Sequence, residues 1–140
     1  MELATPTAVI GEEAAARAVS AAVEKARELG VRINVAVVDG GGNLAAFLRM
    51  PGAFLHSIGI AQDKAYTAVS FRMATADLYR MVQGNPGLRD GLIRRDRMAA
   101  IGGGFPIIID GQLVGGIGVS GASEEQDALC AQAGLAALGL

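Results

Sequence analysis

The sequence has few of the residues that most often mark a dedicated site. Tryptophan is absent, and the 140 residues include two tyrosines, four phenylalanines, one cysteine and one histidine. The lone Cys130 excludes an intrachain disulfide and is typical of proteins from a reducing compartment. With one histidine, no cysteine pair and no HExxH motif, the sequence argues against a zinc site, so we expect no side-chain metal centre.

Strong charge and long apolar runs are also lacking. The formal net charge is −2 and basic residues are scattered, which argues against nucleic acid as a partner. No apolar run has the length of a membrane span, so we expect no membrane association. The residues that follow Met1-Glu2-Leu3 contain neither the basic region nor the apolar region of a secretory signal peptide, so we expect none. We therefore expect a cytoplasmic protein, and its length predicts one domain over residues 1–140.

The pattern of apolar residues and turns predicts an α+β domain. Helices are predicted over residues 5–29, 53–69, 75–82 and 123–138, and strands over 33–38, 44–49, 105–109 and 112–119. The first helix is expected to begin with Thr5 as N-cap and Pro6 as its first residue. Hairpin loops at Asp39–Asn43 and Asp110-Gly111 imply an antiparallel sheet covered by helices. No element is predicted for residues 88–101.

Glycine is present in excess, at 20 residues. Gly115–Gly118 are interpreted as packing glycines, which let an alanine-rich helix or a second subunit approach the sheet. The N–H groups of Gly102 to Gly104 could instead form an anion-binding nest before a strand, or a tight turn. We take Gly103 and Gly104 as candidate substrate-binding residues.

Three side chains are candidates for chemistry. His56 lies near the start of a predicted helix, on the side away from its apolar stripe. It could be a general base, a haem axial ligand or an ordinary surface histidine. Arg49 and Lys64 could bind a carboxylate or a propionate, or be ordinary surface charges. Neighbouring Ala65 and Tyr66 could desolvate Lys64, which would lower its pKa.

Five ordered motifs resemble those of one protein family over about residues 5–138. They are Val37–Leu44, Arg49-Met50-x-Gly52-Ala53, Ala61-x-x-Lys64-Ala65-x-Thr67-Ala68, Gly103-Gly104-x-Pro106 and Gly115–Gly121. The chain is similar to the GlcG/HbpS family, or haem-degrading domain family, which includes the C-terminal domain of PduO-type proteins. This resemblance implies a profilin-like α/β/α domain with a five-stranded antiparallel sheet flanked by helices. It also implies homo-oligomers, with dimers building octamers. Many members carry Asp where this chain has Pro51.

Two main functions follow as hypotheses, with a ligand-free structural oligomer as a third. The main expectation is a cofactor-free enzyme of small-molecule catabolism, an isomerase or lyase resembling tautomerases and hydratases. It would move a proton with His56 on a carboxylated enol, aldehyde or ring-cleavage product held by Arg49 and Lys64. The expected substrate-binding residues are Gly103, Gly104, Thr67 and Ser120. The alternative is a haem- or corrinoid-binding oligomer, with His56 or another side chain near the metal and Arg49 or Lys64 pairing with propionates.

Overall fold

Four strands form one antiparallel sheet in the computed structural model, which describes residues 1–140. The strands are β1 (Asn34–Asp39), β2 (Leu44–Arg49), β3 (Gly104–Ile109) and β4 (Gln112–Ser120), in the order β2-β1-β4-β3. Two hairpins supply the outer pairs, and β1 joins them by pairing with β4, so that Asn34 lies opposite Ser120. The predicted α+β architecture with an antiparallel sheet is confirmed.

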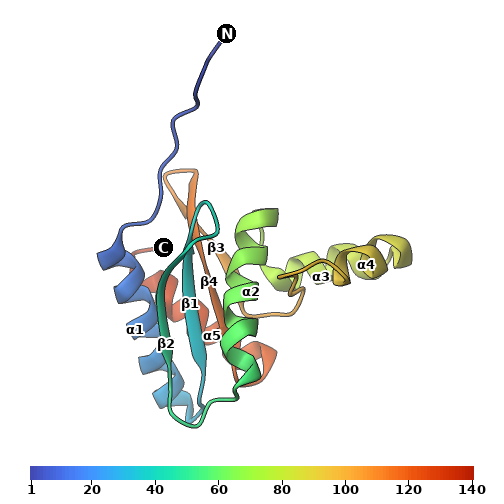
Figure 1. Ribbon diagram of the computed structural model, residues 1–140. Helices are drawn as coiled ribbons and strands as arrows, with labels where there is room; N and C mark the ends of the chain where they lie inside the picture. Colours follow the sequence, from blue (N-terminus) through green and yellow to red (C-terminus); the bar gives the residue numbers. More distant parts are fainter.

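The predicted number of strands is wrong, because the sheet has four strands and not five. The fifth strand was implied by the family resemblance alone, whereas the residue pattern contains only four β-rich runs. Residues 1–10 precede the first helix as an extended arm, which is exposed over residues 1–7 and buried at Ile10 (Figure 1). The Ile10 N–H donates to the Val114 carbonyl oxygen at 2.9 Å, but this single bond does not continue as a ladder.

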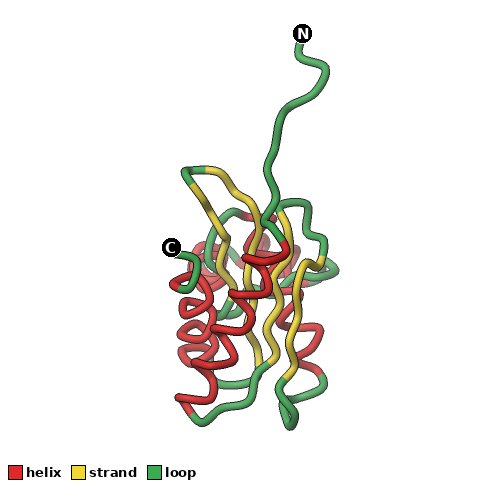
Figure 2. The backbone as a smooth tube through the Cα atoms, turned by 90° about the vertical axis from the view of Figure 1, so that its left-hand side faces the viewer, coloured by secondary structure: helices red, strands yellow, loops and turns green.

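Helices cover both faces of the sheet. They are α1 (Glu12–Leu29), α2 (His56–Phe71), α3 (Thr75–Gln83), α4 (Pro86–Ile93) and α5 (Glu124–Ala136). The helices α1 and α5 pack side by side on one face, α2 covers the other, and Figures 1 and 2 show the strands between them. The α3–α4 pair projects from the α2 side (Figure 1). None of these helices combines the length and the apolar character needed to cross a membrane.

The two faces of the sheet are built from different side chains. In β4, Ile117 and Val119 belong to the main core under α1 and α5. Gly116 and Gly118 alternate with them and face α2, and a Cβ atom on Gly118 would lie 2.1 Å from the Ala61 carbonyl oxygen. Because no side chain intervenes, α2 lies directly on the backbone of β4. The predicted role of these glycines in close packing is confirmed.

The start of one helix and the presence of another differ from the sequence prediction. The first helix begins at Glu12 with Gly11 as N-cap, not at Thr5, because the chain before it stays extended up to the buried Ile10. The helix α4 was not predicted at all. Its sequence signal was present, since the Asn85 side chain accepts the N–H of the third helical residue and proline occupies the first helical position.

Candidate functional site

Lys64 lies in the middle of α2 and is almost completely buried. Its side chain is 2% exposed, and its Nζ donates to the Val119 carbonyl oxygen at 2.9 Å and to Asp127 Oδ2 at 3.2 Å. Asp127 belongs to the first turn of α5. The ion pair therefore joins two helices that cover opposite faces of the sheet.

Burial disfavours both charges of this pair. It lowers the pKa of the Lys64 ammonium group and raises the pKa of the Asp127 carboxyl group, because each ion loses solvation. The attraction between the two charges opposes both shifts. Asp127 Oδ1 also accepts the Ala122 N–H at 2.9 Å. Lys64 is desolvated as the sequence predicted, and its ammonium group is hydrogen-bonded within the chain.

Gly103 lies against this ion pair. Its φ is +123°, and a Cβ atom there would lie 2.9 Å from Lys64 Nζ and 2.6 Å from the Val119 carbonyl oxygen. The Gly103 carbonyl oxygen accepts the Val119 N–H at 3.0 Å. Only glycine fits beside the buried ammonium group with this backbone conformation.

The amides on either side of Gly103 are bound within the chain. The Gly102 N–H donates to Glu124 Oε1, and the Gly104 N–H donates to Thr75 Oγ1, each at 3.0 Å. The Thr75 hydroxyl group in turn donates to the Ile101 carbonyl oxygen. Two of the three N–H groups considered for an anion nest thus fix the loop that leads into β3.

Thr67 and Ser120 are turned into the fold as well. Thr67 Oγ1 donates to the Arg97 carbonyl oxygen and accepts the Ala99 N–H, both at 3.0 Å, which fastens the segment between α4 and β3 onto α2. Ser120 Oγ donates to Ser57 Oγ at 3.2 Å. Thr67, Ser57 and Ser120 are all buried. Their hydroxyl groups contact the chain itself.

Arg49 and His56 lie at the end of the sheet where β2 leads into α2. Arg49 Nη2 donates to the Ala53 carbonyl oxygen at 2.8 Å. Asn34 in the neighbouring strand donates from Nδ2 to the Phe54 carbonyl oxygen at 3.2 Å. These two hydrogen bonds fix the backbone of residues 50–56, which we call the β2–α2 connection.

The β2–α2 connection presents three consecutive exposed side chains. Phe54 is 68% exposed and Leu55 is 74% exposed, and the exposed His56 follows as the first residue of α2. Arg32 supports the same segment, because its Nη1 donates to the Pro51 carbonyl oxygen at 2.8 Å. This segment therefore carries an exposed imidazole and two exposed apolar side chains, and two guanidinium groups bond its backbone.

The structure separates the predicted site residues into two groups. Lys64 and the glycines beside it meet in the interior, with Thr67 one turn further along α2. Arg49 and His56 lie at the two ends of the exposed β2–α2 connection. His56 and Lys64 are eight residues apart on α2, roughly 12 Å along the helix axis. Because Lys64 is buried and His56 is exposed, the structure does not bring these two side chains together.

Sequence reasoning missed Asp127 and Arg32. No local pattern identifies Asp127 as the partner of Lys64, because 63 residues separate them in the chain. A signal for Arg32 was available in the first hairpin. Asn34 pairs with Arg49, so the residue two positions before Asn34 lies beside the end of β2.

Comparisons with known proteins agree with this architecture. A family model described as haem degrading protein HbpS-like matches residues 10–136. A Streptomyces reticuli HbpS double mutant is 39% identical with a TM-score of 0.89, covering 98% of this chain and 92% of that one. The structure of a PduOC haem complex is 38% identical with a TM-score of 0.85, covering 92% of this chain and 94% of that one.

A longer relative shares only part of its length with this chain. The corrinoid adenosyltransferase PduO of Salmonella typhimurium is 41% identical over 121 residues, which is 84% of this chain. The chain spans only 35% of that protein. The family model, by contrast, matches nearly the whole chain, and the sequence motifs agree with it. The chain therefore belongs to the HbpS-like family, as the resemblance to GlcG/HbpS proteins predicted.

Proposed function

We propose that this chain binds haem at the β2–α2 connection, where His56 would supply a nitrogen ligand to the iron and Arg49 would pair with a propionate. One observation carries the proposal. The only histidine of the chain is exposed beside two exposed apolar side chains, Phe54 and Leu55, on a segment whose backbone is fixed by hydrogen bonds.

The residues of this segment suit the three parts of a haem group. The iron needs a protein ligand such as an imidazole nitrogen, which His56 would supply. The porphyrin ring needs apolar contacts, for which Phe54 and Leu55 are available. The propionates need cations, and the planar guanidinium group of Arg49 can hold a carboxylate with two hydrogen bonds. When bound, the haem iron would supply redox and ligand-binding chemistry, and these side chains would bind and orient it.

Among the relatives, support lies with haem rather than with the proton-transfer enzyme that was the main expectation. The family model is described as haem degrading, and the PduOC structure is a haem complex. Neither description concerns an isomerase or a lyase. The geometry adds a second reason against the expected enzyme, which used Lys64 and His56 together. Lys64 is buried against Asp127, while Arg49 and His56 are exposed. Of the two cations considered for propionates, Arg49 is therefore the one we assign.

The test is a titration of the purified protein with hemin, followed by visible absorption. We expect a sharpened and shifted Soret band for the wild type, and loss of this change in His56→Ala. Met81→Leu removes an exposed sulfur donor on α3 without changing the side-chain volume much, so it should titrate like the wild type. An unchanged Soret band in His56→Ala would contradict the assignment of the ligand.

Arg49 is tested in the same titration. Replacing it by glutamine removes a charge-assisted hydrogen bond to the propionate, so we expect about tenfold weaker hemin binding. Arg94→Gln is the matched control, because Arg94 is exposed at the end of α4, away from the β2–α2 connection. Equal affinities for the two variants would remove Arg49 from the proposed site.

A homo-oligomer, with dimers building octamers, is proposed as well. Its support is the apolar surface at the sheet edges, where Leu44 of β2 is 53% exposed and Ile108 of β3 is 43% exposed. Multi-angle light scattering should give the mass of a dimer or of an octamer of the 14.3 kDa chain. A monomer mass at micromolar concentration would contradict the proposal.

A further inference from the structure

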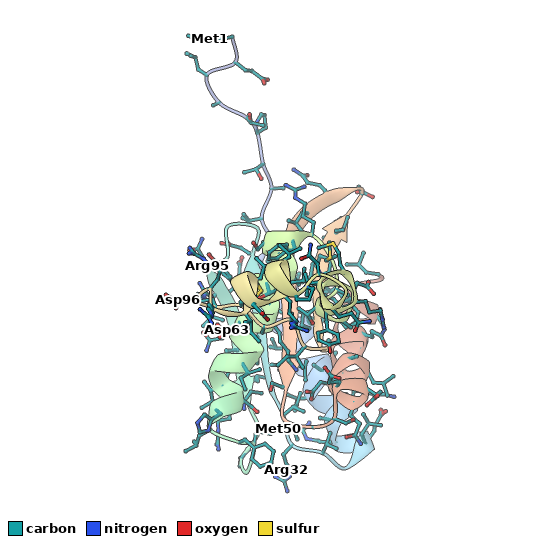
Figure 3. The ribbon with its side chains drawn as sticks, turned by 90° about the vertical axis from the view of Figure 1, so that its right-hand side faces the viewer. Met1, Arg32, Met50, Asp63, Arg95 and Asp96 are labelled. Carbon is teal, nitrogen blue, oxygen red and sulfur yellow. The ribbon has the colours of Figure 1, made fainter.

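A second feature lies beside the β2–α2 connection, at the end of α1. It is an open cavity of about 480 Å³. Its lining contains Val23, Arg27, Gly30, Val31, Arg32, Leu48, Arg49, Met50 and Pro51. Figure 3 shows Arg32 and Met50 together at this end of the molecule, far from the tip of the N-terminal arm. We call this space the arginine cavity.

The arginine cavity has a strong excess of positive charge. Three of its nine lining residues are arginines, and none is acidic. They come from three separate parts of the fold, because Arg27 lies in the last turn of α1, Arg32 in the following loop and Arg49 at the end of β2. No carboxylate lies within 4.0 Å of any of the three guanidinium groups, although six other basic side chains of the chain form such pairs.

The contacts within the chain use only a small part of this donor capacity. Arg32 and Arg49 each donate one hydrogen bond, at 2.8 Å, to a carbonyl oxygen of the β2–α2 connection. A guanidinium group carries five N–H donors in a planar fork, so most donors on each side chain are left for a ligand. Arg27 is favoured where it lies by the dipole of α1. The dipole does not explain why two further arginines line the same space.

The remaining lining of the cavity defines the ligand further. The cavity lining also includes apolar side chains, which are those of Val23, Val31, Leu48, Met50 and Pro51. A simple inorganic anion would leave these apolar side chains without a partner. We propose that the arginine cavity binds a pair of carboxylates joined by an apolar body, with Arg27 and Arg32 acting together with Arg49.

Two sources could present this chemistry. One is the two propionates of a porphyrin whose iron lies at His56, a source that rests on the haem binding proposed above. The other is a free organic diacid. Both require the same arginines, but only the first depends on His56.

The porphyrin source is tested by titration with hemin and with hemin dimethyl ester, in which the carboxylates are esterified. Arg27→Gln and Arg32→Gln should each weaken hemin binding about tenfold and leave binding of the ester unchanged. Arg94→Gln, on the distant α4, should bind both compounds like the wild type. Equal effects of Arg27→Gln on hemin and on its ester would overturn the porphyrin source.

The free diacid is tested without hemin, by calorimetric titration with glutarate. Acetate and inorganic phosphate, each titrated separately at equal ionic strength, are the comparison ligands. We expect saturable glutarate binding that is about tenfold weaker in Arg27→Gln and in Arg32→Gln, and unchanged in His56→Ala. Equal affinity for phosphate would overturn the assignment of an organic diacid.

The two proposals fail in different ways. In one outcome, the Soret change needs His56 but is the same in the Arg27 and Arg32 variants, and no glutarate binds. This outcome would overturn the proposed ligand of the arginine cavity and leave the haem proposal intact. Glutarate binding that needs these arginines, with no hemin binding, would support the cavity and overturn the haem proposal.

Discussion

Lys64 and Asp127 show how a titratable pair can belong to the structure rather than to a ligand. Both side chains are nearly inaccessible, and Lys64 Nζ and Asp127 Oδ2 are 3.2 Å apart. A buried ion pair adds little net stability over a well-packed apolar pair, but leaving one of its charges unpaired is costly. We therefore assign Lys64 to the integrity of the contact between α2 and α5.

Lys64→Met should lower the free energy of unfolding by about 3–5 kcal/mol, because the Asp127 carboxylate would remain buried without its partner. The double variant Lys64→Met/Asp127→Asn removes both charges and keeps an oxygen acceptor for the Ala122 N–H, so it should regain much of the loss. Urea unfolding measures both values.

Lys25→Met is the control for loss of a lysine. Lys25 pairs with Glu28 on the surface of α1, where side chains are 35% and 68% exposed, so its loss should cost less than about 1 kcal/mol. A Lys64→Met variant as stable as Lys25→Met would show that the buried pair does not hold the helices together.

Cys130 makes the stability of the folded chain fall as the pH rises above 9. Burial, reinforced by the charge of Asp127, raises the pKa of its thiol from 9.0 to about 11. The folded chain therefore keeps a proton that the unfolded chain loses, so this contribution is complete below pH 9 and is lost as the pH rises towards 11. Its size is at most about 3 kcal/mol.

The measurement is the free energy of unfolding from pH 8 to pH 11 for the wild type and for Cys130→Ala. The wild type should lose stability more steeply over this range than the variant, which has no thiol to titrate. Parallel curves would mean that the thiol titrates alike in the folded and unfolded chains.

At the scale of elements, the contact between α2 and β4 depends on the absence of side chains. Gly118→Ala would place a Cβ atom 2.1 Å from the Ala61 carbonyl oxygen and 2.5 Å from the Ala65 nitrogen. The helix cannot yield by rotating a side chain, because both contacts are to its backbone. We expect a loss of about 3 kcal/mol or more in thermal or urea unfolding.

Gly59→Ala is the matched control on the same helix. A Cβ atom there meets no atom within 4 Å, and alanine is the better helix former, so stability should stay the same or rise by up to about 1 kcal/mol. Similar losses for the two variants would contradict the close approach of α2 to β4.

Most elements could be predicted because their signals are local. The two hairpins follow from their glycine loops, and α5 follows from the capping box in which Ser123 and Gln126 bond reciprocally. The start of α1 could not be predicted, because residues before Glu12 stay extended through a contact with distant β4. The short α4 was hidden by a proline and glycines that equally favour a turn.

At the scale of the whole molecule, the structure separates the candidate residues that the sequence pointed to into two groups. Arg49 and His56 are close in sequence, and the Arg49 side chain donates to Ala53 in the segment that joins them. Lys64 is also nearby in sequence, but helical geometry and the β4 glycines turn it into the interior. The arginine cavity required the fold itself, since it joins the ends of α1 and β2.

The most direct test of the proposed haem site is the position of the iron in crystals of the hemin-loaded protein, found from anomalous scattering at the iron absorption edge. We predict a single peak per chain at bonding distance from an imidazole nitrogen of His56, with the porphyrin against Phe54 and Leu55. An iron peak elsewhere in the fold, or no iron in the crystals, would contradict the proposed haem site.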